Sequence, residues 1–444
     1  MKKALLWLMI LVMSISVIAA FSLSGCKKEA APAEEKEEVK EVIPSEETEE
    51  EAAEPIVLKY WTYQQSEAKI AEINSVAIDE FEEMYPDVTI ELNVIPYPEY
   101  RDKLLVAVQG GTPPDISTVD QIWNSEFALS DAIIPLDEYI DSSDLISEEM
   151  FFEGAWDSCL YDGQVWGIPV DIDVWYYNFF NKDMFEAAGL DTENPPIVYW
   201  EDLLDSCEKL TTDDQWAVGL QAGKDEATIC IIDSFIYSNG GSIISDDGKT
   251  CTINSPEVIE ALKFYKSLEE YAPEGTINRT QVDTSQLFTE GKVAIFWFPQ
   301  LIQDTLVNNP DLNWGMTVCS ANEGHTPAGT LGGWNLVIYK DAPNKDMAFK
   351  FIEFLTSKDV NLKTVSLLPA NIEAAEEFAK DRLGPKLIID GVAAAKPRPI
   401  SPVYPQISEV QQDMLQQIFS GTSVEEAVET ARVAIQEILD ELYQ

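Results

Sequence analysis

Residues 56–61, Ile-Val-Leu-Lys-Tyr-Trp, begin an alternation of strands and helices. This apolar run predicts a strand, and apolar side chains then recur at helical spacing over residues 70–84. Residues 88–94, Val-Thr-Ile-Glu-Leu-Asn-Val, predict a second strand, followed by a helix that stops at the glycines 110–111. A third strand is predicted over residues 115–119. Because helices connect these strands, we expect parallel pairing and an α/β fold.

The same alternation continues through the rest of the chain. An amphipathic helix is predicted over residues 200–210, and Ser-Pro-Glu at 255–257 is a typical start for another. Residues 293–298 and 336–339 predict buried strands. The last helix begins with a capping box at residues 423–426. The chain therefore has enough regular structure for more than one lobe.

Composition and charge exclude several classes of function. The 444 residues are 45% hydrophobic, which predicts a folded chain of two or more lobes. The formal net charge is −50, so nucleic acid is excluded as a partner because an acidic surface repels phosphates. A single histidine, His325, argues against multi-histidine zinc sites and against a Ser/His hydrolase. We expect no metal and no cofactor.

The amino terminus has the features of a secretory signal. Two lysines at positions 2 and 3 precede a continuous apolar stretch over residues 4–21. Leu23-Ser24-Gly25-Cys26 then matches the bacterial lipobox, in which a lipid is attached to the cysteine sulfur. We expect residues 1–25 to be a lipoprotein signal peptide and Cys26 to be lipidated. The alternatives are an uncleaved membrane helix and an ordinary signal peptide with an incidental cysteine.

Residues 26–55 predict an acidic, extended tether. After Cys26 they hold four lysines against twelve glutamates, and almost no residue there could contribute to a core. The tether accounts for little of the net charge, so the folded body itself is strongly acidic.

The remaining five cysteines do not form a disulfide framework. Their number is odd and no two have CxxC spacing, so at most two bridges are possible and we expect mostly buried free thiols. They are Cys159, Cys207, Cys230, Cys251 and Cys319.

Several segments, in order along the chain, resemble the extracellular solute-binding lipoproteins of sugar ABC transporters, the family of maltose- and glycerol-phosphate-binding proteins. No single segment is specific, but together with the lipobox they cover nearly the whole folded chain. The segments are Gly110-Gly111-Thr112-Pro113-Pro114-Asp115, Gly167-Ile168-Pro169-Val170, residues 180–190, residues 288–295, Gly332-Gly333-Trp334-Asn335, Ala342-Pro343-Asn344-Lys345, Arg398-Pro399 and Tyr404-Pro405-Gln406-Ile407.

The resemblance implies two α/β lobes that are joined by crossings of the chain and enclose a ligand in a cleft by hinge closure. The first lobe would comprise residues 56–170 plus 328–378. The second would comprise residues 171–327 plus 379–444.

Sugars present apolar C–H faces rimmed by hydroxyl groups, so their sites combine aromatic rings with planar polar groups. Trp61 ends the first predicted strand and Gln64 follows it, while Asp120 and Trp123 follow the third strand. The loops after strands are where open α/β sheets bind ligands. We therefore expect these four residues to contact ligand. The alternatives are a core edge for Trp61, a solvated turn for Gln64, and a helix start with a buried aromatic for the other two.

The predicted crossing adds Asp173 and Trp175 to the candidates. Asp171 and Asp173 share a face if the segment is extended, so they could bind sugar hydroxyls, stay solvated, or form the acid pair of a glycoside hydrolase. Trp297 lies within a predicted buried strand, so a ligand contact and core packing are equally supported.

Trp334 is the strongest aromatic candidate. The two glycines before it permit close approach of the backbone, and its segment matches a cleft segment of the family. Asn335 would accompany it as a hydroxyl partner, and we expect Trp334→Ala to lose binding but still fold. Arg398 and Tyr404 lie in a proline-rich stretch that lobe closure would bring to the ligand, or they form a salt bridge that braces the loop.

We expect a lipid-anchored, monomeric binding component of an ABC importer on the extracytoplasmic side of the membrane, with no catalytic residues. It would capture a neutral carbohydrate, most simply an oligosaccharide, and deliver it to a membrane permease. The alternatives are a surface glycoside hydrolase, and a binder of anions such as uronates or phosphates, or of polyamines, on the same scaffold.

Overall fold

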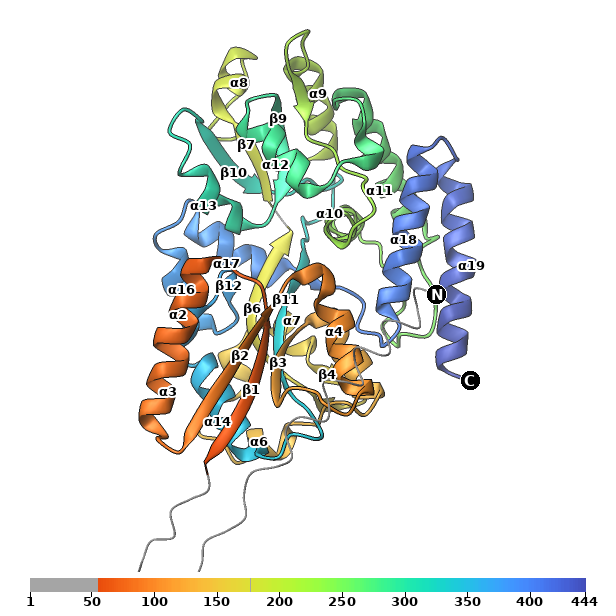
Figure 1. Cartoon of the computed structure of the whole chain (residues 1–444). Coiled ribbons are helices and arrows are strands. Elements are labelled where there is room, and N and C mark those ends of the chain that lie inside the picture. The colour runs from red at the N-terminus through yellow and green to blue at the C-terminus, as the bar shows by residue number, and fades with distance from the viewer. Residues whose placement is uncertain (1–54, 176) are drawn as a thin grey trace, which may run out of the picture. The chain divides into compact units, whose positions relative to one another are not determined.

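The computed structural model describes residues 55–175 and 177–444 (Figure 1). The apolar amino-terminal stretch, Cys26 and nearly all of the acidic tether lie outside the described residues, so they stay predictions. Within the described ranges, no helix combines the length and the apolar character that a membrane crossing needs.

The first lobe is built on a seven-stranded sheet. β1 pairs in parallel with both β2 and β3, as their helical connections predict. β11 instead lies between β3 and β6 and pairs antiparallel with both. The expectation of parallel pairing is wrong there, because the chain reaches β11 from the second sheet and not through a helix that crosses over the first. The strands are β1 (Ile56–Tyr63), β2 (Val88–Ile95), β3 (Ile116–Asp120), β6 (Ile168–Trp175), β11 (Thr330–Ile338), β12 (Leu368–Pro369) and β13 (Lys396–Pro397).

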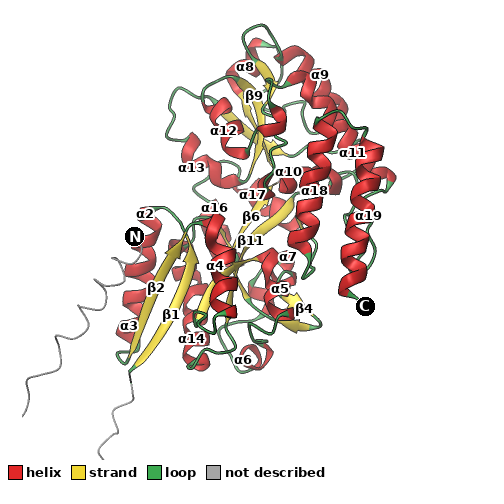
Figure 2. Ribbon diagram, turned by 45° about the vertical axis from the view of Figure 1, so that its right-hand side comes forward, coloured by secondary structure: helices red, strands yellow, loops and turns green. Residues whose placement is uncertain are grey.

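The second lobe is built on a four-stranded sheet in the order β10-β7-β9-β8. Figure 2 shows β9 of this sheet beside α12 (Gln281–Thr289). All six residues of β9 are buried, as the continuous apolar run predicts. Phe296 and Trp297 of β9 point to opposite faces of this sheet. Phe296 joins the first apolar cluster, which extends from the seven-stranded sheet into this one. Trp297 joins a second cluster with α10 (Glu226–Tyr237), α11 (Pro256–Ser267), α18 (Tyr404–Phe419) and α19 (Val424–Leu442). The strands are β7 (Tyr177–Asn181), β8 (Trp216–Val218), β9 (Val293–Phe298) and β10 (Trp314–Val318), and a separate hairpin contains β4 (Leu160–Tyr161) and β5 (Gln164–Val165).

The chain changes sheet between Trp175 and Tyr177 and returns between Val318 and Thr330. The expected boundary between residues 170 and 171 falls inside β6, which stays in the first sheet to its end. The expected return near residue 328 lies just before β11. Beyond residue 379, β13 still pairs with β11, and only α18 and α19 join the second cluster.

The helices begin and end where the sequence predicts caps. α4 stops at Gly110 and Gly111, and Gly111 adopts a left-handed φ of 66°. The Ser255 and Ser423 side chains each accept a backbone N–H in the first turn of α11 and α19. The helices, with π and 3₁₀ segments marked η, are α2 (Glu67–Glu72), η1 (Ile73–Ile78), α3 (Asp79–Met84), α4 (Tyr97–Gln109), η2 (Gln121–Trp123), α5 (Asn124–Leu129), α6 (Asp137–Asp141), η3 (Glu148–Met150), α7 (Glu153–Asp157), α8 (Lys182–Ala187), α9 (Trp200–Leu210), α10 (Glu226–Tyr237), α11 (Pro256–Ser267), η4 (Leu268–Tyr271), η5 (Thr276–Asn278), α12 (Gln281–Thr289), η6 (Gln300–Ile302), α13 (Gln303–Leu306), α14 (Lys345–Thr356), α15 (Lys358–Thr364), α16 (Ile372–Ala379), α17 (Pro385–Ala394), α18 (Tyr404–Phe419) and α19 (Val424–Leu442).

The five cysteines of the described chain are all buried and carry free thiols, which confirms the expectation from their number and spacing. Burial raises the pKa of the Cys230 and Cys319 thiols, so both are held in the unreactive protonated form. These residues therefore pack as small apolar side chains.

Candidate functional site

A cavity of about 600 Å³ lies where elements of both lobes meet, and it is the candidate site. Aromatic rings, carboxylates, carboxamides and one guanidinium form its wall. The lining residues are Tyr63, Gln64, Tyr97, Pro98, Asp120, Asp173, Trp175, Asp225, Glu226, Ala227, Cys230, Gln281, Gly333, Trp334, Leu367 and Arg398.

Six of the candidates from the sequence lie on this wall. Four of them lie near or directly after the carboxyl ends of β1, β3 and β6, and Trp334 of β11 pairs with Asp120, which is why residues far apart in the sequence meet there. They are Gln64, Asp120, Asp173, Trp175, Trp334 and Arg398.

The other five candidates lie behind the wall or elsewhere. Trp297 is buried in the second apolar cluster, with its ring 5.2 Å from that of Phe235, so core packing prevails there. Trp61 packs on the edge of the first cluster. Asn335 is buried and donates to the Ser158 hydroxyl over 3.1 Å, so its amide is used within the lobe.

Trp123 and Tyr404 support residues of the wall without lining it. The Trp123 ring is stacked behind Tyr97 at 6.0 Å. The Tyr404 hydroxyl donates to Glu226 over 2.9 Å.

Sequence reasoning missed two aromatic rings of the wall, Tyr63 and Tyr97. Tyr63 is the last residue of β1, and Tyr97 begins α4 directly after β2. The rule that selected Asp120, namely a position at the end of a parallel strand, would have selected both. Asp225, Glu226 and Gln281 gave no such signal, because they begin helices that do not follow directly from a predicted strand.

The aromatic part of the wall is layered. The Tyr63 and Trp334 rings are stacked, with centroids 3.9 Å apart and planes within 9° of each other. Tyr97 and Trp123 contact Trp334 edge-on at 5.9 and 5.8 Å, and Tyr100 lies 5.9 Å away. Trp334 is therefore enclosed by other rings and only 6% exposed, so most of the aromatic surface on the cavity side belongs to its neighbours.

Two glycines of β11 make room for the acidic part of the wall. A Cβ on Gly332 would lie 2.1 Å from a carboxylate oxygen of Asp173. A Cβ on Gly333, which has φ 138°, would lie 2.2 Å from the Asp171 carbonyl oxygen. The two glycines thus permit a close approach of β6 to β11 within the lobe, and Gly332 lets Asp173 lie against β11.

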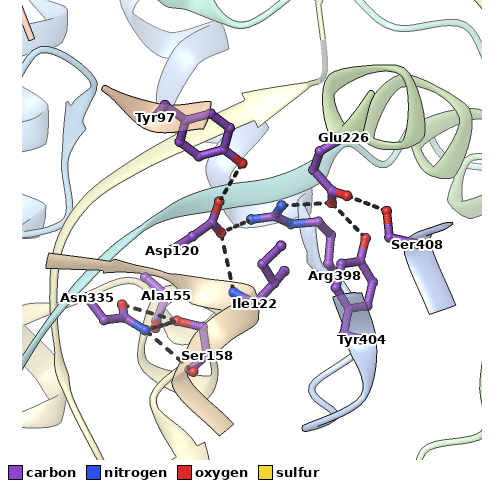
Figure 3. A network of polar contacts seen from close by, with 10 residues as sticks. All are labelled: Tyr97, Asp120, Ile122, Ala155, Ser158, Glu226, Asn335, Arg398, Tyr404 and Ser408. Atoms are coloured by element: carbon purple, nitrogen blue, oxygen red, sulfur yellow. Dashed lines mark hydrogen bonds and ion pairs between the residues drawn. The ribbon is translucent and has the colours of Figure 1, made fainter. Parts of the chain in front are cut away.

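Arg398 is the centre of a polar network (Figure 3). Its Nη2 donates to Asp120 Oδ1 over 2.7 Å, and its Nη1 donates to Glu226 Oε1 over 2.9 Å. The arginine side chain is only 4% exposed. Tyr404 and Ser408 also donate to Glu226, while the backbone N–H of Ile122 donates to Asp120. This guanidinium is thus fully engaged by carboxylates on its two outer nitrogens.

Comparison with known proteins identifies the family. The model of the bacterial extracellular solute-binding proteins matches residues 65–362.

The chain is a bacterial extracellular solute-binding protein.

The resemblance inferred from its sequence is thereby confirmed, as are the α/β fold and its two lobes. An ABC transporter solute-binding protein from Thermotoga lettingae TMO, whose structure holds α-D-tagatose, is 30% identical with a TM-score of 0.75, over 86% of this chain and 100% of that one. A Brucella abortus (strain 2308) protein described as a binding protein is 26% identical over 361 residues, which are 78% of this chain and 85% of the relative. The sugar-binding protein MalE from Xanthomonas citri has a TM-score of 0.76 over 87% of this chain and 98% of that one, but at 22% identity this likeness shows the fold alone.

The cavity of this solute-binding protein is acidic. Asp120, Asp173, Asp225 and Glu226 line it, and among its described lining residues Arg398 is the one cation. Burial raises the pKa of Asp173 to about 6, although Arg398 opposes this shift. Burial also raises the pKa of Glu226, again against the effect of Arg398. An acidic wall favours hydroxyl-rich or cationic solutes over anions.

Asp171 does not share this wall. Its carboxyl group is 1% exposed and accepts from the Tyr63 hydroxyl over 3.2 Å. Burial, together with the charge of Asp173, raises its pKa well above the usual range. Asp171 therefore supports Tyr63 from behind and cannot reach a solute together with Asp173.

Asp233, on α10 near the network, gives a testable pH dependence. It is fully buried, and its Oδ1 accepts from Gln411 Nε2 over 2.9 Å. Burial raises its pKa to about 8, whereas in the unfolded chain an aspartate titrates near 4. Between these values the folded protein holds more protons, so its stability falls as the pH rises. We expect Asp233→Asn, which is always neutral, to remove this loss.

In urea unfolding, Asp233→Asn should match the parent protein near pH 4 and exceed its free energy of unfolding by at least about 1 kcal/mol at pH 8. Asp102→Asn, at an exposed position on α4, is the matched control and should leave the pH profile unchanged. Equal profiles for Asp233→Asn and the parent protein would show that Asp233 is already ionised in the folded state.

Proposed function

We propose that this solute-binding protein captures a neutral carbohydrate, most simply an oligosaccharide, and delivers it as a monomer to the membrane permease of an ABC importer. The observation that carries the proposal is the composition of the cavity wall. Aromatic rings at Tyr63, Tyr97 and Trp175 match the apolar faces of sugar rings. Carboxylates and carboxamides such as Asp173 and Gln64 match pairs of hydroxyl groups. The tagatose bound by the Thermotoga lettingae relative supports the same class of solute.

The charge of the wall speaks against anionic solutes. An anion needs converging cations, and the single described guanidinium of the wall is held between Asp120 and Glu226. A uronate or a sugar phosphate would therefore meet uncompensated negative charge.

The buried position of Asp171 likewise speaks against a glycoside hydrolase. Such an enzyme needs two carboxyl groups that both reach the glycosidic bond, and only Asp173 of this pair lines the cavity. The relatives compared with this chain are binding proteins, which agrees with a role in transport.

A thermal-shift screen tests the proposed solute. The chain from residue 56 onwards is incubated with neutral mono- and oligosaccharides, uronates and polyamines, and its melting temperature is recorded. A solute at 100 times its dissociation constant should add about 2.7 kcal/mol of stability, seen as a higher melting temperature. We expect a shift with a neutral sugar and none with uronates. A shift with putrescine or spermidine alone would contradict the proposal and assign the acidic wall to a cation.

We further propose that residues 1–25 are removed as a signal peptide and that a lipid on Cys26 holds the protein at the outer side of the cell membrane. The lipobox Leu23-Ser24-Gly25-Cys26 supports this, and the acidic tether up to residue 55 would give the binding lobes reach. In mass spectrometry, the parent protein should begin at Cys26 and carry the added mass of a lipid, whereas Cys26→Ser should keep residues 1–25, because cleavage follows attachment of the lipid to the sulfur. A parent protein that keeps residues 1–25 would instead indicate an uncleaved membrane helix, and one that begins at Cys26 without the lipid mass would indicate an ordinary signal peptide.

A further inference from the structure

We propose that Arg398 is a positioning residue that ties the two lobes together across the cavity, and that it does not bind the solute through its charge. This goes beyond the proposed function, because it concerns how the cavity walls are held in place whatever solute occupies them.

The two carboxylates that hold Arg398 belong to different lobes. Asp120 is the last residue of β3, in the seven-stranded sheet of the first lobe. Glu226 is the first residue of α10, whose apolar side chains pack in the second cluster; its Phe235, for example, contacts Trp297 of β9. One planar guanidinium bonds both, at 2.7 and 2.9 Å. The two ion pairs therefore link β3 to α10.

Each carboxylate is fixed by its own surroundings. Asp120 also accepts the backbone N–H of Ile122, which caps the following 3₁₀ segment, and the Tyr97 hydroxyl at 3.4 Å. Glu226 also accepts from Tyr404 and Ser408 in the first turns of α18. Further along α18, Ile407, Met414 and Ile418 pack in the second cluster, whereas the Tyr404 ring belongs to the first. Neither carboxylate can follow the arginine without losing these bonds. A relative movement of the lobes must then stretch the bonds to Arg398.

The backbone that carries Arg398 is itself restrained. Pro397 and Pro399 flank it, and proline fixes the backbone φ angle at about −65°. Just before it, β13 pairs with Thr330 and Leu331 at the start of β11. Arg398 therefore projects from a stiff segment beside a crossing, and its reach to both carboxylates is set by the fold.

The geometry also explains why this residue does not bind the solute as a cation. Both of its outer nitrogens are directed at carboxylates, and the whole side chain is nearly inaccessible. Within the described residues its Nε has no partner, but this atom is buried as well. Asp173 and Asp225, which Arg398 does not bond, are then the carboxylates left for the solute.

The experiment measures the distance between the lobes. Spin labels are placed on cysteines introduced at Val106→Cys on α4 and Asp213→Cys in the loop before β8, both exposed positions, in a protein that carries Cys26→Ser. The native thiols of the described chain are buried and will not react. The label–label distance distribution is recorded by pulsed electron paramagnetic resonance without and with the sugar found in the screen.

Glu226→Gln and Asp120→Asn each replace one carboxylate that bonds Arg398 with a neutral amide of nearly the same size. We expect both to broaden or shift the distance distribution in the absence of sugar, and to weaken binding by roughly 5- to 150-fold, because less of the protein holds the binding arrangement. Glu126→Gln is the matched control: it breaks the Arg101–Glu126 ion pair, which lies within the first lobe, and should leave the distribution unchanged.

Unchanged distributions in both Glu226→Gln and Asp120→Asn would overturn the proposal. A purely structural role, in which the ion pairs merely stabilise the fold, would lower the melting temperature without moving the distribution. The measurement without sugar decides the question even if the screen finds no sugar, so failure of the proposed function and failure of the tie can be told apart.

Discussion

Replacing Trp334 with alanine is expected to lower the free energy of unfolding by about 3–5 kcal/mol. The side chain is 6% exposed, and it packs against Tyr63, Tyr97, Tyr100 and Trp123. Alanine would leave a cavity among these rings, which cannot collapse onto it because each is held by its own strand or helix. The expectation from the sequence, that Trp334→Ala loses binding but folds normally, is therefore replaced by a large loss of stability.

Chemical unfolding followed by circular dichroism checks this prediction. The matched control is Trp216→Ala, because Trp216 is also on a strand but is 37% exposed and should cost about 1 kcal/mol or less. Trp334→Phe keeps an aromatic ring behind Tyr63 and should recover part of the loss. If Trp334→Ala lowers the free energy of unfolding no more than Trp216→Ala does, the Trp334 ring is not part of the core. It would then again be a candidate for contact with the solute.

Arg398→Met is expected to lower the free energy of unfolding by a similar amount, about 3–5 kcal/mol, for an electrostatic reason. Methionine fills much of the space but leaves Asp120 and Glu226 without their cation in a buried place. A triple variant that combines Arg398→Met with Asp120→Asn and Glu226→Gln no longer contains these unpaired charges. This triple variant should therefore be clearly more stable than the single one.

The same unfolding experiment compares these variants, with Arg432→Met as the control. Arg432 pairs with Glu429 on the exposed side of α19, and loss of such a pair should cost about 1 kcal/mol or less. A triple variant no more stable than Arg398→Met would show that packing of the arginine stem, and not charge compensation, is what the network contributes.

Much of the fold could be predicted from the sequence because the decisive signals are local. The apolar runs of β1, β2 and β9, the glycines after α4 and the serine caps of α11 and α19 each lie within a few residues. The antiparallel centre of the first sheet could not be predicted in this way. The place of β11 between β3 and β6 depends on pairing across more than 150 residues, and no local pattern specifies it.

The site was predictable to the extent that it follows strand ends. Asp120 was found by that rule, Asp173 from the predicted crossing, and Trp334 from its two glycines and the family resemblance. The three are neighbours because β3, β6 and β11 are paired. The role of Trp297 could not be predicted, because β9 is apolar on both faces. Its sequence does not show which face packs on helices and which faces a cavity. The partners of Arg398 could not be predicted from the sequence, because Arg398 and Asp120 lie 278 residues apart in the chain.

The central position of β11 has a consequence for synthesis of the chain. β3 and β6 are complete once residue 175 has been made, but the strand that joins them ends at residue 338. At about 5–20 residues per second, translation needs roughly 8 to 33 s to cover that interval. During this time the seven-stranded sheet lacks its middle strand and cannot close. The strand order therefore delays completion of the first lobe until most of the polypeptide has been synthesised.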